Sequence, residues 1–280
     1  MTVSVEAHAK INLALDVLDM RQDGFHNIDT VFYEIDLADR LDVAWAEKEG
    51  HISVHEGTAP ADSTNLAVRA TKLLAPDCGV TIDLWKRIPA QAGLGGGSSD
   101  AAAALQAIEK LSGPMGNLAD VAVQLGSDVP FFLLGGCARG TGRGEILTPI
   151  RTGIQLHVLL VKPDIGVPTG WAYQELDAIG EAGKSMYAQR VNSTLEANDR
   201  DGLLQVMGND FERVVVKRFP EVVSLVNRLK DAGSEFAMLC GSGSAVFGVF
   251  PTRDDAQRAG ESFTDMWHAA SSGLVRKVGQ

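Results

Sequence analysis

The chain has 280 residues, of which 45% are hydrophobic and 22% are charged, and its formal net charge at pH 7 is −11. This balance is typical of a folded globular protein, and the negative charge argues against binding to nucleic acid. We find neither a signal peptide nor a run of about 18 apolar residues, and therefore expect a cytoplasmic protein with no membrane contact. Cys78, Cys137 and Cys240 are too far apart in sequence to form a metal-ligand motif, so we expect reduced thiols and no metal site built from cysteine.

The first half of the chain predicts strands followed by a mixture of helices and strands. A turn is expected at Asp23-Gly24, and Ser63 to Asn65 offer caps for a helix that ends before Pro76. The apolar patterns predict strands at 3–17, 28–37, 40–45, 80–85 and from 129 to 134, and helices at 65–74, 99–111 and 118–125.

A domain boundary is expected near residue 153, which gives an N-terminal domain of 1–153 and a C-terminal domain of 154–280. The second half predicts strands at 155–161, 236–239 and 245–250, and helices at 171–176, 191–207, 222–232 and 253–270. Strands and helices alternate without a regular βαβ repeat, which favours the α+β class.

The most informative segment is PAQAGLGGGSS, which has four glycines in five residues. Such density costs conformational entropy and indicates that the backbone must approach another group closely. Ser98 and Ser99 are expected to cap the alanine-rich helix that follows, and a helix start with unpaired N–H groups is an anion site. We therefore expect the segment to hold the phosphates of a nucleotide, through Pro89, Ala90, Gln91, Ala92, Gly93, Leu94, Gly95, Gly96, Gly97, Ser98 and Ser99.

Two better-known phosphate-binding loops do not fit this segment. The P-loop of ATPases requires a Gly-Lys pair followed by Ser or Thr, and this segment has no lysine. The dinucleotide fingerprint begins with Gly93-x-Gly95, but Gly97-Ser98 breaks its spacing. The remaining alternative is a flexible connector in front of the helix.

On these residues the sequence resembles the GHMP small-molecule kinases, whose second motif is a Pro-x3-Gly-Leu-Gly-(Gly)-Ser-Ser loop. The resemblance implies a two-domain fold, with an N-terminal domain like domain 2 of ribosomal protein S5 and a ferredoxin-like C-terminal domain. It also implies ATP as phosphoryl donor, and Mg²⁺ is expected on chemical grounds to neutralise the phosphates. Family blocks occur in order at 7–17, 21–32, 65–70, 125–133, 142–150, 209–212 and 240–247.

The resemblance also implies catalytic residues. Asp128, in LGSDVPFF, matches the family's catalytic aspartate, and it follows a predicted helix and precedes a predicted strand. From the residues alone it is equally a turn or capping aspartate. Lys10 matches a lysine that keeps this carboxylate ionised, although a lysine at an edge strand could also extend into solvent. Asn12 lies on the same strand face as Lys10 and is a candidate for binding the substrate hydroxyl.

A small-molecule substrate that carries a cytidine diphosphate is implied by the DGFH turn. His26 matches the histidine that reads the cytosine, and Phe32 and Tyr173 match rings that stack on it, with core packing as the alternative for Phe32. Phe25 replaces the usual tyrosine and so loses a hydroxyl. The alternatives are a sister kinase that acts on mevalonate, homoserine or a sugar, and a non-catalytic nucleotide-binding protein.

On the nucleotide side, Asn65 and Lys86 match pocket positions of the family. Asn65 is otherwise a helix cap, and Lys86 a solvated charge after a strand. Ser99 is a candidate ligand of Mg²⁺. The turn at Gly241 to Ser244 matches the third family motif, which packs against the site of phosphate transfer, and would by itself be a hairpin turn.

Overall fold

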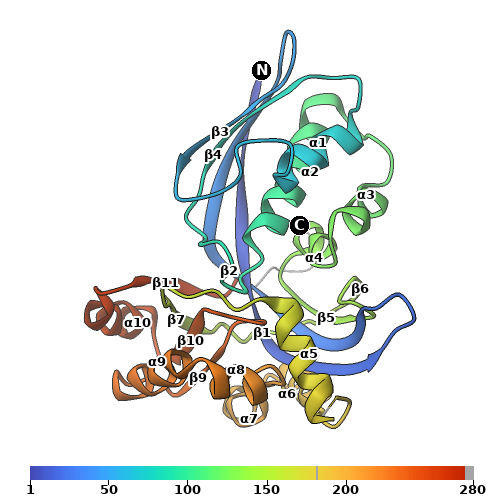
Figure 1. Ribbon diagram of the computed structural model, residues 1–280. Coiled ribbons are helices and arrows are strands. Elements are labelled where there is room, and N and C mark those ends of the chain that lie inside the picture. The colour runs from blue at the N-terminus through green and yellow to red at the C-terminus, as the bar shows by residue number, and fades with distance from the viewer. Residues whose placement is uncertain (181, 275–280) are drawn as a thin grey trace. The chain divides into compact units, whose positions relative to one another are not determined.

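The computed structural model describes residues 1–180 and 182–274. These residues form two compact units, each built from segments that are not contiguous in sequence. The first unit contains residues 1–9, 37–90 and 95–135, and the second contains 10–36, 91–94 and the chain from Gly136 onward. Two long strands, β1 (Thr2–Met20) and β2 (His26–Trp45), contribute residues to both units (Figure 1).

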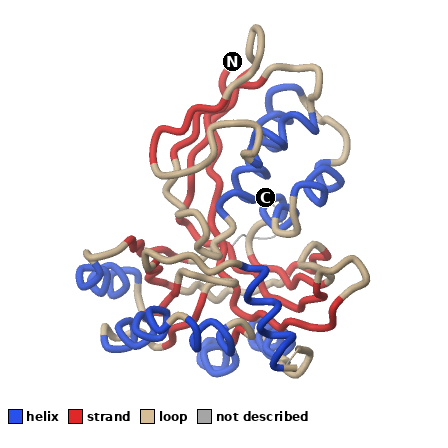
Figure 2. Tube along the Cα trace, viewed as in Figure 1, coloured by secondary structure: helices blue, strands red, loops and turns tan. Residues whose placement is uncertain are grey.

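In the first unit, β1 and β2 form a sheet with β3 (Ile52–Glu56) and β4 (Val80–Trp85) in the order β3-β4-β2-β1. Strand β4 alternates buried and half-buried residues, as its sequence predicts. One side of this sheet is covered by helices α1 (Leu66–Leu74), α2 (Gly96–Ser112), α3 (Leu118–Leu125) and α4 (Val129–Leu134) (Figure 2). The alanine-rich face of α2 is buried and allows close packing against α1 and α4.

The second unit contains an antiparallel sheet in the order β11-β7-β10-β9. Its strands are β7 (His157–Lys162), β9 (Phe236–Leu239), β10 (Val246–Phe250) and β11 (Trp267–Ser272). Three shorter strands pair elsewhere: β5 (Cys137–Thr141) with β2 and with β6 (Ile146–Pro149), and β8 (Gly208–Asn209) in parallel with β1. The helices are α5 (Thr169–Ile179), α6 (Tyr187–Glu196), α7 (Arg200–Val206), α8 (Glu212–Arg218), α9 (Pro220–Asp231) and α10 (Arg253–Gly260), followed by a 3-10 turn at Glu261–Phe263.

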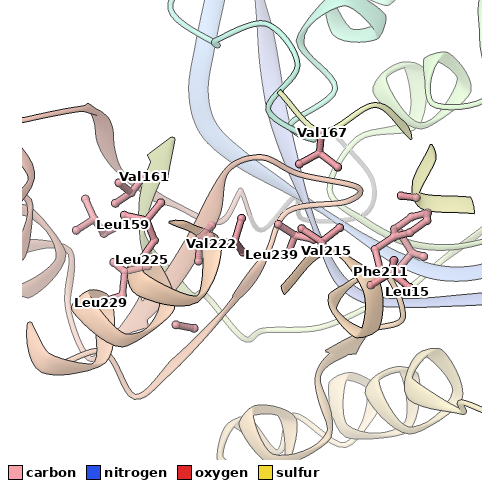
Figure 3. Close-up of a cluster of buried hydrophobic side chains, with 14 of the residues drawn as sticks. Leu15, Leu159, Val161, Val167, Phe211, Val215, Val222, Leu225, Leu229 and Leu239 are labelled. Atoms are coloured by element: carbon pink, nitrogen blue, oxygen red, sulfur yellow. The ribbon is translucent and has the colours of Figure 1, made fainter. Parts of the chain in front are cut away.

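The core of the second unit lies between this sheet and its helices. Leu159 and Val161 of β7 pack with Leu225 and Leu229 of α9, and the cluster continues to Phe211 (Figure 3). Ala172 and Leu176 of α5 belong to the same cluster. Helix α5 is therefore fixed by its buried face, while its other residues remain accessible.

The α+β class is confirmed, but the strand predicted from 129 to 134 is wrong, because these residues form helix α4. The run VPFFLL is continuously apolar and so carries no period that separates a strand from a buried helix. Pro130 lies in the first turn of α4, where a proline is tolerated because it removes no helical hydrogen bond.

The helix predicted at 253–270 is also wrong beyond residue 260. Residues Trp267–Ser272 form β11, whose sequence WHAASS has weak strand propensity but pairs over its whole length with β7. The helix predicted at 191–207 is two helices, since Asn198 adopts a φ of 52° and Asp199 caps α7. Strands β3, β5, β6 and β8 were not predicted. They are short: β3, β5 and β8 pair with segments distant in sequence, and β6 pairs with the neighbouring β5.

Among residues 1–180 and 182–274, no helix is long and apolar enough to cross a membrane.

Candidate active site

The first half of the glycine-rich loop, Gln91–Leu94, belongs to the second unit and contacts the turn at Gly241 to Ser244. The Ser244 N–H donates to the Gln91 carbonyl at 3.2 Å, and the Lys10 N–H donates to the Leu94 carbonyl at 3.1 Å. A Cβ at Gly93 would lie 1.9 Å from the Cys240 carbonyl oxygen, so the two backbones approach as closely as glycine allows. The turn therefore packs against the first half of the glycine-rich loop, and its position at the site of phosphate transfer stays a prediction.

Asn209 also supports the turn at Gly241 to Ser244. Its side-chain amide donates to the Leu239 carbonyl at 3.1 Å and to the Gly241 carbonyl at 2.7 Å, while its oxygen accepts from the Phe211 N–H at 3.0 Å. Asn209 is 3% exposed. The sequence NDFE was recognised as a family block, but its role in holding the turn was not predicted.

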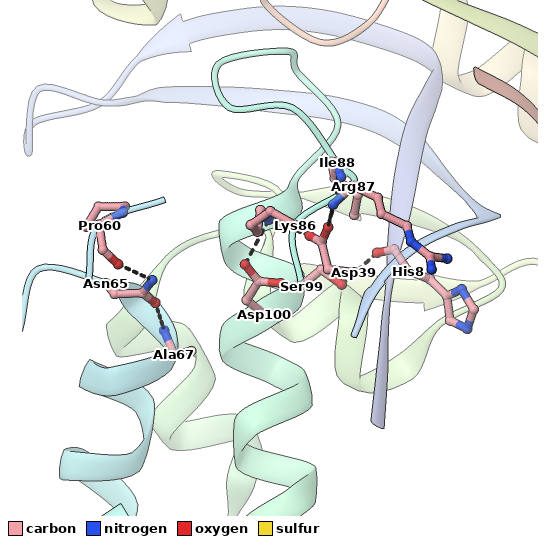
Figure 4. A network of polar contacts seen from close by, with 10 residues as sticks. All are labelled: His8, Asp39, Pro60, Asn65, Ala67, Lys86, Arg87, Ile88, Ser99 and Asp100. Carbon is pink, nitrogen blue, oxygen red and sulfur yellow. Dashed lines mark hydrogen bonds and ion pairs between the residues drawn. The ribbon is translucent and has the colours of Figure 1, made fainter. Parts of the chain in front are cut away.

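The second half of the loop starts helix α2 in the first unit. Gly95, with a φ of 73°, is the N-cap, so the prediction that Ser98 and Ser99 cap this helix is wrong and both lie in its first turn. The Ser99 hydroxyl donates instead to the His8 carbonyl at 2.6 Å (Figure 4). The first N–H groups of α2 have no partner within the helix and carry its positive dipole end. Gly97 is exposed, and a Cβ there would meet nothing closer than 3.7 Å, which leaves room for an anion.

Next to this helix start, Lys86 is buried and paired with two carboxylates (Figure 4). Its ammonium group donates to Asp39 and, at 2.8 Å, to Asp100. The other oxygen of Asp39 accepts from the N–H groups of Arg87 and Ile88 at 2.5 and 2.8 Å. Lys86 is thus not a solvated charge. Through these two ion pairs, Lys86 links strand β2 and helix α2 to the segment before the glycine-rich loop.

Electrostatics in this cluster follow from burial. Burial raises the pKa of Asp100 to about 7, against the opposing effect of the Lys86 charge, and the negative Asp39 raises it further. Burial alone would lower the pKa of Lys86, but the charges of Asp100 and Asp39 outweigh it and raise the pKa. One oxygen of Asp100 is buried without a hydrogen-bond partner among the described residues. Neither aspartate was predicted. The available signal for Asp100 was a carboxylate at the start of an alanine-rich helix, whereas Asp39 lies in a strand with several other charged residues.

Asn65 is confirmed as the cap of α1. Its side-chain oxygen accepts from the Ala67 N–H at 2.9 Å, and its amide donates to the Pro60 carbonyl at 2.8 Å (Figure 4). With both ends engaged and only 5% of the residue exposed, it fixes the loop in front of α1. Its contact with a nucleotide stays a prediction.

A buried polar chain begins at Lys10 in the second unit. The Lys10 ammonium donates to the Asn12 oxygen at 2.8 Å, the Asn12 amide donates to the Thr30 hydroxyl at 2.7 Å, and that hydroxyl donates to the Ala14 carbonyl at 2.6 Å. Lys10 and Asn12 therefore share a strand face, as predicted, and Lys10 is only 4% exposed, so it does not extend into solvent from an edge strand. Thr30, which was not predicted, fixes the orientation of the Asn12 amide.

Asp128 is the N-cap residue of α4 in the first unit, where its side chain makes no capping hydrogen bond to that helix. It precedes a helix and not the strand that was predicted. Its side chain is half-buried, and its role as a proton acceptor stays a prediction.

The aromatic residues predicted to bind the base differ in their environments. Phe25 is 55% exposed, with the Arg143 guanidinium 5.1 Å from its ring centroid. Phe32 is 1% exposed and lies with the Lys10 ammonium 5.4 Å from its centroid. Tyr173 stacks on the His26 ring at a centroid distance of 4.8 Å, and the edge contact between Tyr173 and Phe211 spans 4.9 Å.

Within residues 1–180 and 182–274 there is no group of three or more His, Cys, Asp or Glu side chains arranged to hold a metal ion.

Comparison with known proteins places these features in a family. Residues 65–136 match the family model of the GHMP kinases N terminal domain, and residues 191–269 match that of the GHMP kinases C terminal domain. A curated relative from Bacillus pumilus is 40% identical over 266 residues, covering 92% of this chain and 91% of the relative. A second from Moorella thermoacetica is 41% identical over 265 residues, covering 91% and 93%. Both are named 4-diphosphocytidyl-2-C-methyl-D-erythritol kinase.

Among solved structures, a crystal structure of 4-(cytidine 5'-diphospho)-2C-methyl-D-erythritol kinase is 34% identical and superposes with a TM-score of 0.83, covering 97% of this chain and 99% of that one. A homoserine kinase from Cytophaga hutchinsonii has a TM-score of 0.72 at 18% identity, which shows a shared fold alone.

Proposed function

The chain belongs to the GHMP kinase family, and from this premise we propose that it transfers the terminal phosphoryl group of ATP to the 2-hydroxyl of 4-diphosphocytidyl-2-C-methyl-D-erythritol, a step of non-mevalonate isoprenoid precursor synthesis. The observation that carries the proposal is identity of about 40% to relatives of this name over more than nine-tenths of the chain. The use of ATP and of a small-molecule substrate supports a cytoplasmic location. The three free cysteines support it as well, because thiols stay reduced in that compartment.

In phosphoryl transfer the protein mainly positions the reactants and stabilises charge. The 2-hydroxyl oxygen bonds to the terminal phosphorus of ATP, the bond to the bridging oxygen breaks, and ADP leaves. We assign Asp128 as the carboxylate that accepts the hydroxyl proton, and Lys10 as the cation that favours its ionised form. Asn12, whose side-chain oxygen accepts from Lys10, is assigned to orient the hydroxyl.

The phosphates of ATP fit the start of helix α2. The free N–H groups of its first turn and the open space at Gly97 match a bound anion, and the strongly negative net charge makes such local donors necessary. Mg²⁺ accompanies ATP in this chemistry and neutralises phosphate charge. Ser98, in the first turn of α2, would be the nearest hydroxyl to a bound Mg²⁺, because the Ser99 hydroxyl is buried and donates to the His8 carbonyl.

For the cytosine, the exposed ring of Phe25 supports stacking better than the buried ring of Phe32. Stacking of a base on an aromatic ring contributes about 1–3 kcal/mol, so loss of the tyrosine hydroxyl at Phe25 leaves the larger contribution intact. His26 lies beside Phe25 in sequence and is assigned to the edge of the base.

The test is ATP consumption by the purified chain with each candidate alcohol. We expect rapid turnover with the cytidine diphosphate substrate and none above background with mevalonate or homoserine. The opposite pattern would replace the proposed substrate with that of a sister kinase.

A second measurement addresses Asp128. Asp128→Asn keeps the size of the side chain but cannot accept the proton, so we expect kcat to fall by about 10²–10⁴ while ATP binding, measured by calorimetry, is retained. The matched control is Asp120→Asn on helix α3, an exposed aspartate of the same unit. Rates within a few-fold of each other for the two variants would remove Asp128 from the chemistry.

A further inference from the structure

Two side chains of helix α5 contact the ring of His26. The Tyr173 ring lies parallel to it within 11° at 4.8 Å, and the Asp177 carboxylate lies 2.8 Å from its Nε2 atom. Tyr173 and Asp177 are four residues apart and so share one face of the helix. The adjacent face of α5 is anchored in the core through Ala172 and Leu176, and Tyr173 packs against the same cluster. Helix α5 therefore fixes the imidazole in two ways: Tyr173 stacks on its face, and Asp177 contacts its edge.

The contact with Asp177 also determines where the ring carries its proton. An ionised carboxylate only accepts hydrogen bonds, so Nε2 must donate. The His26 side chain is 5% exposed and that of Asp177 is 32% exposed, which keeps the pair partly shielded from water. In a neutral imidazole with hydrogen on Nε2, the other nitrogen, Nδ1, is an acceptor.

The position of Asp177 in its helix indicates that it does not serve helix stability. It lies in the last turn of α5, where the helix dipole disfavours a negative charge. The same turn offers Gly180 as a C-cap, so the helix ends without help from this side chain. A carboxylate at this unfavourable position therefore points to a role in its contact with His26.

We propose that Asp177 is a positioning residue that holds His26 with its proton on Nε2 and so presents Nδ1 as an acceptor to the amino group of the substrate's base. This rests on the proposed function, in which His26 reads the base. Cytosine carries an N–H₂ donor at position 4, whereas uracil carries an acceptor oxygen there. An Nδ1 acceptor thus selects cytosine, and a ring free to place its proton on Nδ1 loses that preference.

The first measurement does not depend on activity. The ¹⁵N shifts of His26 in the labelled full-length chain report which ring nitrogen carries hydrogen, with His26→Gln used for assignment. At pH 8 we expect hydrogen on Nε2 and an unprotonated Nδ1 in the wild type, and a mixture of both tautomers in Asp177→Asn, whose amide can donate or accept. Hydrogen on Nδ1 in the wild type would overturn the proposal.

The second measurement is kinetic and compares the cytidine diphosphate substrate with its uridine analogue. For Asp177→Asn and Asp177→Ala we expect KM for the cytidine compound to rise about tenfold with kcat within about twofold, and the preference over the uridine compound to fall about tenfold. The matched control, Glu175→Gln, removes an exposed charge from the same helix and should change neither value. An unchanged preference for cytidine over uridine in both Asp177 variants would overturn the proposal. Absence of turnover by the wild type would instead overturn the proposed function, and the tautomer measurement would then decide the proposal about Asp177.

Discussion

A single buried cation, Lys86, pairs with two buried carboxylates in the first unit, and its loss would remove the counter-charge of both. Removing one partner of such a group costs about 3–5 kcal/mol, because the remaining charges are neither solvated nor paired. We therefore expect Lys86→Met to lower the free energy of unfolding in urea by about this amount.

The neighbouring Arg87→Met is the control for this substitution. The Arg87 side chain is exposed, and its N–H contact with Asp39 comes from the backbone, so the change should stay within about 0.5 kcal/mol of the wild type. Equal stability of the two variants would show that the cluster contributes nothing to folding.

Residue identities at the site were easier to predict than their surroundings. Lys10, Asn12 and His26 were found from local motifs, and strand periodicity placed Lys10 and Asn12 on one face, although it did not predict the hydrogen bond between them. The partners Thr30 and Asp177 were not found, since they come from sequence separations of 18 and 151 residues that no local pattern reveals. The assigned roles in catalysis and binding stay predictions.

At the level of elements, the glycine-rich loop contains two kinds of glycine. Gly93 has a φ of 76° and no space for a Cβ beside the Cys240 carbonyl, whereas Gly97 lies in a helix with open space. Gly93→Ala should therefore destabilise the protein by at least about 1–2 kcal/mol for its left-handed backbone alone. Thermal unfolding measures this effect.

Gly97→Ala should behave in the opposite way. Alanine favours the helix by up to about 1 kcal/mol, so the melting temperature should hold or rise. Its methyl group enters the space assigned to the phosphates, so KM for ATP should rise about tenfold or more, corresponding to at least about 1.4 kcal/mol. An unchanged KM would show that the phosphates do not approach this turn.

Elements with a clear period or cap were predicted well, as the helix at Leu118–Leu125 and the strand at Val80–Trp85 show. The failures at α4 and β11 have one cause. The six-residue apolar run of α4 and the sequence WHAASS of β11 carry little local preference, so their structure is decided by the helices and strands that they pack against.

Across the whole molecule, Asp36 joins segments that are distant in sequence within the second unit. It accepts from the Ser271 hydroxyl at 2.6 Å and the Ser272 N–H at 2.9 Å, and it pairs with Arg253. Burial alone would raise the pKa of Asp36, but these hydrogen bonds and the Arg253 charge outweigh it and hold the pKa below its ordinary 3.8.

A lowered pKa in the folded state means that Asp36 contributes stability above pH 3.8, which is lost as the pH falls through its folded-state pKa. Asp36→Asn should thus be less stable than the wild type at pH 7, and the difference should shrink below about pH 4. Urea unfolding at several pH values measures it, with Asp231→Asn, an exposed aspartate of α9, as the control. A difference that does not vary with pH would mean that the Asp36 charge is not the cause.

The α+β class could be predicted from the sequence, whereas the grouping of residues into these compact units was not; the domain boundary near residue 153 stays a prediction. A boundary at a single point is the natural expectation for two domains, whereas residues 10–36 belong to the unit that also holds the chain from Gly136 onward. This grouping depends on pairings such as Leu15 with Asn209, which have no signature in the local sequence.

The participation of residues 10–36 in the second unit has a consequence for synthesis on the ribosome. Glu34 and Ile35 find their backbone partners in Leu274 and Gly273, which are translated about 240 residues later. At about 5–20 residues per second, this separation takes roughly 12 to 48 s, during which the apolar residues of the early segment remain without their final neighbours. The nascent protein is thus expected to depend on protection from chaperones until β11 and the residues that follow it emerge.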